Sequence, residues 1–146
     1  MYDLKPLALD EIPAHIFSSL SNKNPLEAYF ARDYLFVYDN EKTILEMKPQ
    51  FDQIKQDEKI IVTAKSNGKY DFISRFFCPD ININEDPVTG SAHCALTPYW
   101  SKALNKNQFK AYQASKRGGE MEIEFKDNRV LMTGNAKTVI EGTFYL

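Results

Sequence analysis

The chain has 146 residues, a formal net charge of −2 at pH 7 and 43% hydrophobic residues. Such a chain can bury a core of its own, which excludes an intrinsically disordered protein. Lysine and arginine are spread along the sequence without a basic stripe, and no apolar run reaches about 18 residues, so we expect neither nucleic-acid binding nor a membrane span. We expect one domain over residues 1–146, in the cytoplasm, because residues 1–20 lack the pattern of a signal peptide.

In chain order, the first half of the sequence alternates helical and β-prone stretches. Asp10–Leu20 is predicted to be a helix with its first residue as N-cap. The β-prone stretch Glu27–Asp39 predicts a strand pair or one bent strand. Lys48-Pro49 is predicted to open a second helix, because proline suits a first helical turn. Two more strands are expected, at Ile60–Ala64 and Tyr70–Phe77.

The second half is predicted to contain one long helix followed by strands. Val88–Asn105 is the longest helical candidate, and Pro98 could kink or split it. Its residues are small or apolar on nearly all sides, which is typical of a helix buried all round by a curved sheet. Strands are expected at Phe109–Ser115, Met121–Phe125, Arg129–Thr133 and Lys137–Leu146. The mixture of elements indicates an α+β fold with a mixed, mostly antiparallel sheet.

The cysteines and histidines give little indication of a metal site. Cys78 and Cys94 lack the CxxC spacing of a zinc site and lie in apolar surroundings, which predicts buried, reduced thiols. His15 and His93 are far apart and have no matching carboxylates, so no metal is expected. Within its apolar helix, His93 is more simply interpreted as a hydrogen-bonded core residue than as a catalyst.

The stretch around Asp86 offers chemistry as well as structure. Pro87 holds Asp86 extended, and either Asp86 or Thr89 can cap the helix that follows. Gly90 and Ser91 fall in its first turn, where backbone N–H groups lack intrahelical partners and can bind a carboxylate or phosphate. Spacing alone leaves two interpretations open, a capped core helix and one side of an active site.

Four ordered blocks of sequence resemble the phenazine-biosynthesis PhzF-type family. These blocks are EDPVTGSAHCAL at residues 85–96 with PYW at 98–100, SRFFCP at 74–79, QASKRGG at 113–119 and GNA at 134–136. Their number and order make the resemblance more specific than a single short motif would be. The resemblance covers most of the chain, from about residue 31 onward.

The resemblance implies a diaminopimelate-epimerase-like fold, in which two similar halves, each a sheet wrapped round a central helix, face each other across a cleft. It implies an isomerase or epimerase that transfers protons on a small carboxylate substrate without a metal or organic cofactor. This chain matches the second half only. By the same resemblance, Asp86 is the catalytic carboxylate, and Gly90, Ser91 and Thr89 bind the substrate.

The first-half glutamate and histidine segment of that family have no counterpart in this sequence. Glu85 does not replace the glutamate, because neighbouring residues of an extended chain point to opposite sides. Three hypotheses therefore stay open: an enzyme half that pairs with a first-half chain, a homodimer that rebuilds the cleft from two copies, and a catalytically incomplete small-carboxylate-binding or interaction module.

Overall fold

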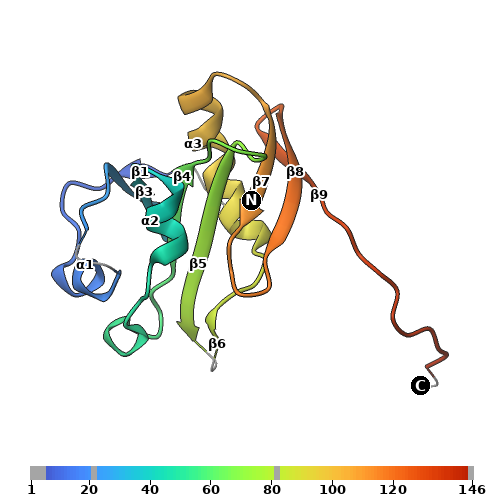
Figure 1. The fold of residues 1–146 in the computed structure, drawn as a ribbon, viewed down its shortest axis with the longest axis horizontal. Helices are drawn as coiled ribbons and strands as arrows, with labels where there is room; N and C mark the ends of the chain where they lie inside the picture. The colour runs from blue at the N-terminus through green and yellow to red at the C-terminus, as the bar shows by residue number, and fades with distance from the viewer. Residues whose placement is uncertain (1–5, 21–22, 81–82, 145–146) are drawn as a thin grey trace.

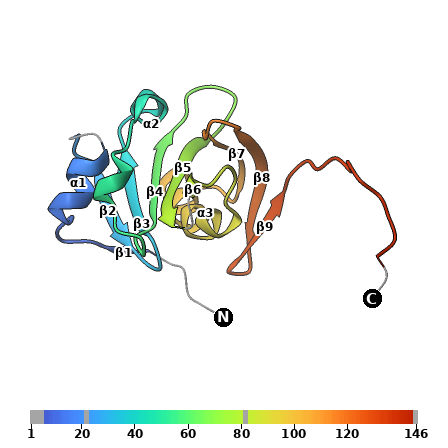
Figure 2. The same ribbon diagram turned by 90° about the horizontal axis from the view of Figure 1, so that it is seen from below.

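A curved sheet encloses the helix α3 in the computed structural model (Figures 1 and 2). The structure describes residues 6–20, 23–80 and 83–144. Its strands are β1 (Leu7–Ala8), β2 (Glu27–Phe30), β3 (Tyr34–Tyr38), β4 (Ile60–Lys65), β5 (Phe72–Asp80), β6 (Ile83–Glu85), β7 (Gln108–Gln113), β8 (Gly119–Lys126) and β9 (Arg129–Thr133). Its helices are α1 (Ala14–Leu20), α2 (Glu41–Glu46) and α3 (Gly90–Leu104), with a 3₁₀ turn at Phe51–Gln53.

The strands form one mixed sheet in the order β1-β2-β3-β4-β5-β7-β8-β9, and β6 pairs with β5. Most neighbouring strands are antiparallel. The β3–β4 and β5–β7 pairs are parallel, and each is joined by a crossover that contains a helix, α2 and α3 respectively. A parallel pair requires such a long connection. The predicted mixed, mostly antiparallel α+β sheet is therefore confirmed.

Two hydrophobic cores lie on the two faces of the sheet. Along β5, Phe72 and Phe76 point toward α3, while Ile73 and Phe77 belong to the core beneath α1 and α2. This alternation follows from the two-residue period of a strand. Because both faces are covered, the middle of the sheet is apolar throughout, and Ile60, Ile61 and Val62 are fully buried in succession.

Helix α3 is anchored in the concave face of the sheet. Trp100 stacks on Phe72 with ring centroids 5.4 Å apart, and its indole Nε1 donates to Thr63 Oγ1 at 3.1 Å. The helix runs through Pro98 without a break and ends at Asn105, which adopts the left-handed conformation with φ of 49°. The predicted long helix is thus confirmed, and Pro98 does not split it. None of the described helices is long and apolar enough to be a transmembrane segment.

The predictions for the first helices need correction. Helix α1 begins at Ala14, four residues later than predicted, because the Pro13 carbonyl accepts the first bonds from Ile16 and Phe17. A second helix opening at Lys48-Pro49 was the wrong prediction. Helix α2 precedes that site because the Asn40 side chain caps it by accepting from the Thr43 amide at 3.0 Å. Shortly after Pro49 the chain forms only the 3₁₀ turn at Phe51–Gln53 and no α-helix.

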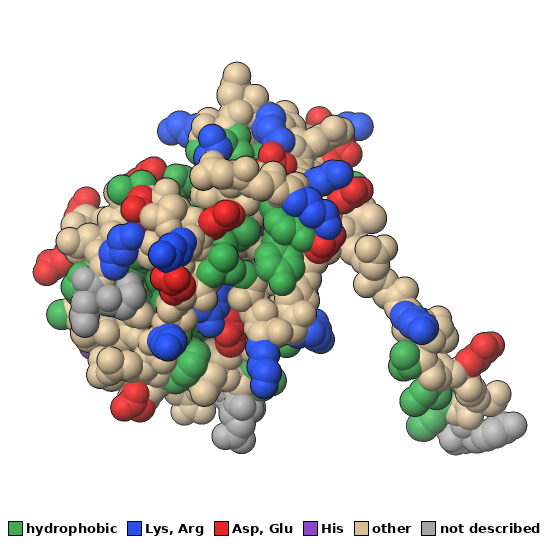
Figure 3. All heavy atoms as spheres, in the orientation of Figure 1, with side chains coloured by type: hydrophobic (Ala, Val, Ile, Leu, Met, Phe, Trp, Pro, Cys, Tyr) green, Lys and Arg blue, Asp and Glu red, His purple; other side chains and the backbone are tan. Residues whose placement is uncertain are grey.

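The prediction of a closing strand at Lys137–Leu146 is wrong for its described part. Residues 134–144 form neither a helix nor a strand and extend away from the body of the protein (Figure 3). Val139, Ile140 and Phe144 are more than four-fifths exposed. A strand needs a neighbour to accept its hydrogen bonds, and none of the described residues supplies one here.

The prediction of buried cysteines also needs correction. Cys78 and Cys94 are half-buried rather than buried.

The close packing of Gly119 against Val88 gives a test of this fold. A Cβ atom at residue 119 would lie 2.2 Å from Val88 Cγ2, whereas a Cβ at Gly68 would meet nothing within 4 Å. We expect Gly119→Ala to lower the free energy of unfolding by about 1–3 kcal/mol through overpacking. The control Gly68→Ala should stay within about 0.5 kcal/mol of the parent. Urea unfolding measures both, and an unchanged midpoint for Gly119→Ala would contradict the packing.

Candidate functional site

The carboxylate of Asp86 lies where the chain leaves β6 and turns into α3. The Asp86 amide still donates to the Phe76 carbonyl of β5 at 3.1 Å, so the sheet holds the backbone at this point. Pro87 then directs the chain away from the strand. The Asp86 side chain is half-buried and accepts a hydrogen bond from the Thr89 hydroxyl. The carboxylate is therefore fixed in direction while part of it stays open to solvent.

Glu85, the neighbouring acid, points to the other side and is engaged in the structure. Arg75 binds its carboxylate through two bonds, Nε to Oε1 at 2.7 Å and Nη2 to Oε2 at 2.9 Å. The same guanidinium donates to the Met47 carbonyl at 2.7 Å. Glu85 thus belongs to a partly buried ion pair that ties β5 and β6 to the segment after α2. Glu85 and Asp86 do not share a face, which agrees with the prediction from the extended backbone.

Gln113, at the end of β7, holds the segment between Asp86 and α3 in place. Its Oε1 accepts from the Thr89 amide at 2.7 Å, and its Nε2 donates to the Asp86 carbonyl at 2.7 Å. Gln113 is fully buried. Ser115 adds a bond from its hydroxyl to the Pro87 carbonyl at 2.8 Å. The sequence placed Gln113 and Ser115 in a motif, but their roles become apparent only through these contacts across the fold.

Thr89 does not cap α3 with its side chain, contrary to one of the two capping predictions. It is the N-cap of α3 by position, but its side chain makes no capping bond. Its hydroxyl donates to Asp86 and accepts from Gln113 Nε2 at 3.1 Å. Thr89 is buried, and its amide is also taken by Gln113. In this arrangement the Thr89 hydroxyl is engaged by Asp86 and Gln113.

Gly90 and Ser91 form the open part of the site. They are the first two residues of α3, where amides lack intrahelical acceptors, and among the described residues we find no acceptor for either amide. Gly90 is exposed, and Ser91 is half-buried. Arg32, from the turn between β2 and β3, donates from Nη2 to Ser91 Oγ at 3.0 Å. Sequence reasoning missed Arg32, because it lies 59 residues before Ser91 and belongs to none of the motifs.

His93 is a core residue and not a second acid–base group. Its ring is fully buried against Phe72, and Nδ1 lies 2.8 Å from the Thr89 carbonyl. Since a carbonyl only accepts, Nδ1 carries the hydrogen, and Nε2 has no partner among the described residues. Burial lowers the pKa of His93 to about 4, so the ring is neutral near pH 7. Burial also raises the pKa of the nearby Cys94 thiol, which therefore stays protonated.

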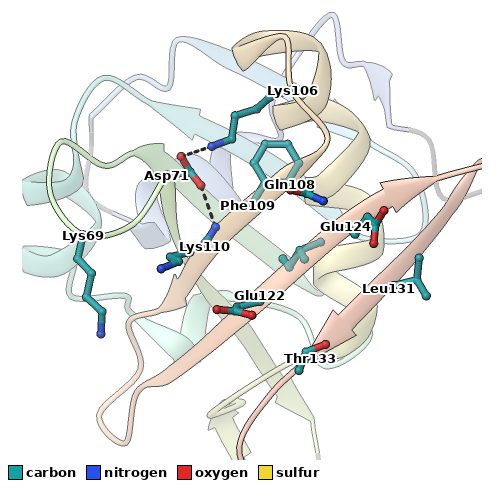
Figure 4. Close-up of a pocket in the computed structure, with 11 residues that line it drawn as sticks. Lys69, Asp71, Lys106, Gln108, Phe109, Lys110, Glu122, Glu124, Leu131 and Thr133 are labelled. Carbon is teal, nitrogen blue, oxygen red and sulfur yellow. Dashed lines mark hydrogen bonds and ion pairs between the residues drawn. The ribbon is translucent and has the colours of Figure 1, made fainter.

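A groove lies elsewhere, on the outer face of β7, β8 and β9 (Figure 4). It has a volume of about 670 Å³, and neither Asp86 nor Ser91 lines it. Within it, Asp71 accepts from Lys106 Nζ at 2.6 Å and from the Lys110 amide at 2.8 Å. No group of three potential metal ligands occurs within residues 6–20, 23–80 and 83–144. The start of α3 is thus the candidate site.

Comparisons with known proteins agree on one family. The profile of the PhzC-PhzF family, described as phenazine biosynthesis-like protein, matches residues 8–142. An uncharacterized isomerase of Halalkalibacterium halodurans is 51% identical over 117 residues, which are 78% of this chain and 44% of that protein. An uncharacterized isomerase of Pseudomonas aeruginosa is 43% identical over 116 residues, again 78% of this chain and 44% of that protein.

Solved structures support the same fold. A PhzF-family phenazine biosynthesis protein of Enterococcus faecalis superposes with a TM-score of 0.85 at 41% identity, covering 97% of this chain and 55% of that one. A putative phenazine biosynthesis PhzC/PhzF protein of Clostridium difficile gives 0.84 at 35% identity, covering 100% and 56%. The predicted diaminopimelate-epimerase-like half is consistent with both. The chain spans about half the length of these relatives.

The buried neutral His93 predicts a pH dependence of stability. The ring titrates near pH 6.5 when unfolded and near 4 when folded, so protons favour the unfolded chain between these values. The contribution of neutral His93 to the free energy of unfolding should therefore be complete above pH 6.5. It should fall by about 3 kcal/mol as the pH drops toward 4. His93→Asn keeps a donor for the Thr89 carbonyl but cannot titrate, so its unfolding free energy should fall less over this range.

His15→Gln is the matched control, since His15 is partly exposed and pairs with Glu58. Urea unfolding at several pH values measures the three proteins. If His93→Asn loses as much stability as the parent between pH 6.5 and 4, the assignment of the pH dependence to His93 is wrong.

Proposed function

The chain belongs to the PhzC-PhzF family of phenazine biosynthesis-like proteins, and from this premise we propose that it is one half of an isomerase that moves a proton on a small carboxylate substrate. The relatives named isomerases support the class of reaction. The observation that carries the proposal is the fixed carboxylate of Asp86 beside the open first turn of α3.

In this proposal the substrate carboxylate binds to the amides of Gly90 and Ser91. Unpaired amides and the positive end of the helix dipole favour an anion at this position. Asp86 then lies on one side of the adjacent substrate carbon and transfers a proton to or from it. Side chains alone carry the proton, so the proposed reaction needs no metal and no organic cofactor.

A second acid–base group must act from the opposite face of the substrate. Glu85 is engaged by Arg75, and His93 is buried and neutral, so neither is placed for this role. The matched region covers 55% and 56% of the two solved structures, so each of them contains a large additional stretch of chain that this protein does not match. We therefore propose that a first-half chain supplies the second group and completes the cleft.

The exposed arm at residues 134–144 supports pairing with such a chain. Ile140 and Phe144 are four residues apart, so an extended backbone presents both on the same side. Exposed apolar side chains on an arm with unpaired backbone groups are suited to adding a strand to another sheet. The family match includes the arm as far as residue 142, so it belongs to the shared architecture.

The experiment mixes this chain with the part of the Halalkalibacterium halodurans relative that it does not cover. Small amino acids and aromatic carboxylic acids are incubated with the mixture in deuterated water, and NMR follows the replacement of carbon-bound hydrogen by deuterium. We expect exchange only with both chains present. Asp86→Asn should reduce its rate by about 10²- to 10⁴-fold, the usual contribution of a general acid–base group, without weakening the pairing.

Asp127→Asn is the control, because Asp127 is exposed in the β8–β9 turn, where its positive φ also suits asparagine. Equal exchange by Asp86→Asn and the parent would contradict the assignment of Asp86. Exchange by this chain alone, with a dimer in sedimentation, would favour two copies that share the cleft. If ligands bind but no mixture shows exchange, the remaining hypothesis is a small-carboxylate-binding module without catalytic activity.

A further inference from the structure

We infer that Arg32 is a positioning residue, which turns the Ser91 hydroxyl into a donor toward the ligand and so selects an anionic group at the start of α3. The inference rests on the proposed function, since it concerns the same site. It adds a residue from the turn between β2 and β3 to a site otherwise built by residues 86–91 and 113–115.

The direction of the hydrogen bond between Arg32 and Ser91 carries the inference. A guanidinium has only donors, so at 3.0 Å from Arg32 Nη2 the Ser91 oxygen must accept. The single hydroxyl hydrogen of Ser91 is then left for another acceptor. Within the described part of the chain we find no acceptor for it, and Ser91 lies at the open end of the helix. A ligand at this position would meet a donor.

The buried carboxylate of Asp33 holds the guanidinium in this position. Arg32 Nε donates to Asp33 Oδ1 at 3.0 Å, and Nη2 donates to Oδ2. The Asp33 side chain is 5% exposed, whereas the Arg32 side chain is 46% exposed. A two-pronged bond of this kind fixes the plane of the guanidinium as well as its distance. The orientation of the Ser91 hydroxyl is thus set by a buried group on another element.

The proposal predicts a preference for charge that a purely structural tie would not produce. A hydroxyl held as a donor, together with two free amides, favours a carboxylate over a neutral amide of the same shape. If Arg32 only fastened the β2–β3 turn to α3, its loss would lower stability and leave this preference unchanged. The ratio of the two affinities therefore separates positioning from support.

The test compares benzoate with benzamide, which differ in the charged group. NMR titrations follow the amide signals of Gly90 and Ser91 in the labelled chain. The parent should bind benzoate at least about tenfold more tightly than benzamide, since loss of a charge-assisted bond commonly costs a factor of this size. Arg32→Met keeps the apolar stem, removes the donors, and should reduce the preference to about threefold or less. Ser91→Ala should have the same effect.

In the double variant the two losses should not add, because both act through one hydroxyl. Arg129→Met is the control, since Arg129 is exposed at the start of β9. This variant should prefer benzoate over benzamide as strongly as the parent does. Dispersed spectra show that each variant is folded. An unchanged preference in Arg32→Met would overturn the role of Arg32 and leave the proposed function standing. Absence of benzoate binding by the parent would overturn both the inference and the carboxylate site.

Discussion

The hydrogen bonds of one buried amide, Gln113, determine the arrangement of the candidate site. Its side chain accepts from the Thr89 amide and donates to the Asp86 carbonyl and the Thr89 hydroxyl. These bonds satisfy backbone groups that α3 and the Asp86 turn would otherwise leave buried without partners, which is costly. The Thr89 hydroxyl in turn donates to the Asp86 carboxylate, so loss of this set of Gln113 bonds, the Gln113 clamp, would free the Asp86 side chain as well as the start of the helix.

The sheet brings Gln113 to this position through its parallel pairing of β5 and β7. In that register Ser74 lies beside Gln113, and the crossover between the two strands contains both Asp86 and α3. The carboxyl end of β7 therefore meets the amino end of the helix that precedes it. The buried stack of Trp100 on Phe72 holds the far part of α3 against β5, the other strand of this parallel pair. Core packing and site geometry thus depend on one supersecondary unit.

Local sequence predicted the parts of this unit that are formed by adjacent residues. The Asp86-Pro87 pair and the small residues after it predicted both the turn and the first helical residues, Gly90 and Ser91. Arg32 could not be predicted, because its contact with Ser91 depends on how the β2–β3 turn is placed against α3. The segment at 137–144 has β-prone residues but no neighbouring strand among the described residues, so propensity alone gave the wrong result. Either Asp86 or Thr89 was predicted to cap α3, but the Thr89 hydroxyl donates to the Asp86 carboxylate and makes no capping bond.

The hydrogen bonds of Gln113 hold the segment from Asp86 to Thr89 in this chain without a partner. Hydrogen exchange of the Thr89 amide in the isolated chain, measured by NMR, tests the claim directly. We expect protection of the Thr89 amide comparable to that of the core strand β4, and its loss in Gln113→Leu while β4 stays protected. Exchange of the parent's Thr89 amide as rapid as that of the exposed arm at 134–144 would contradict it.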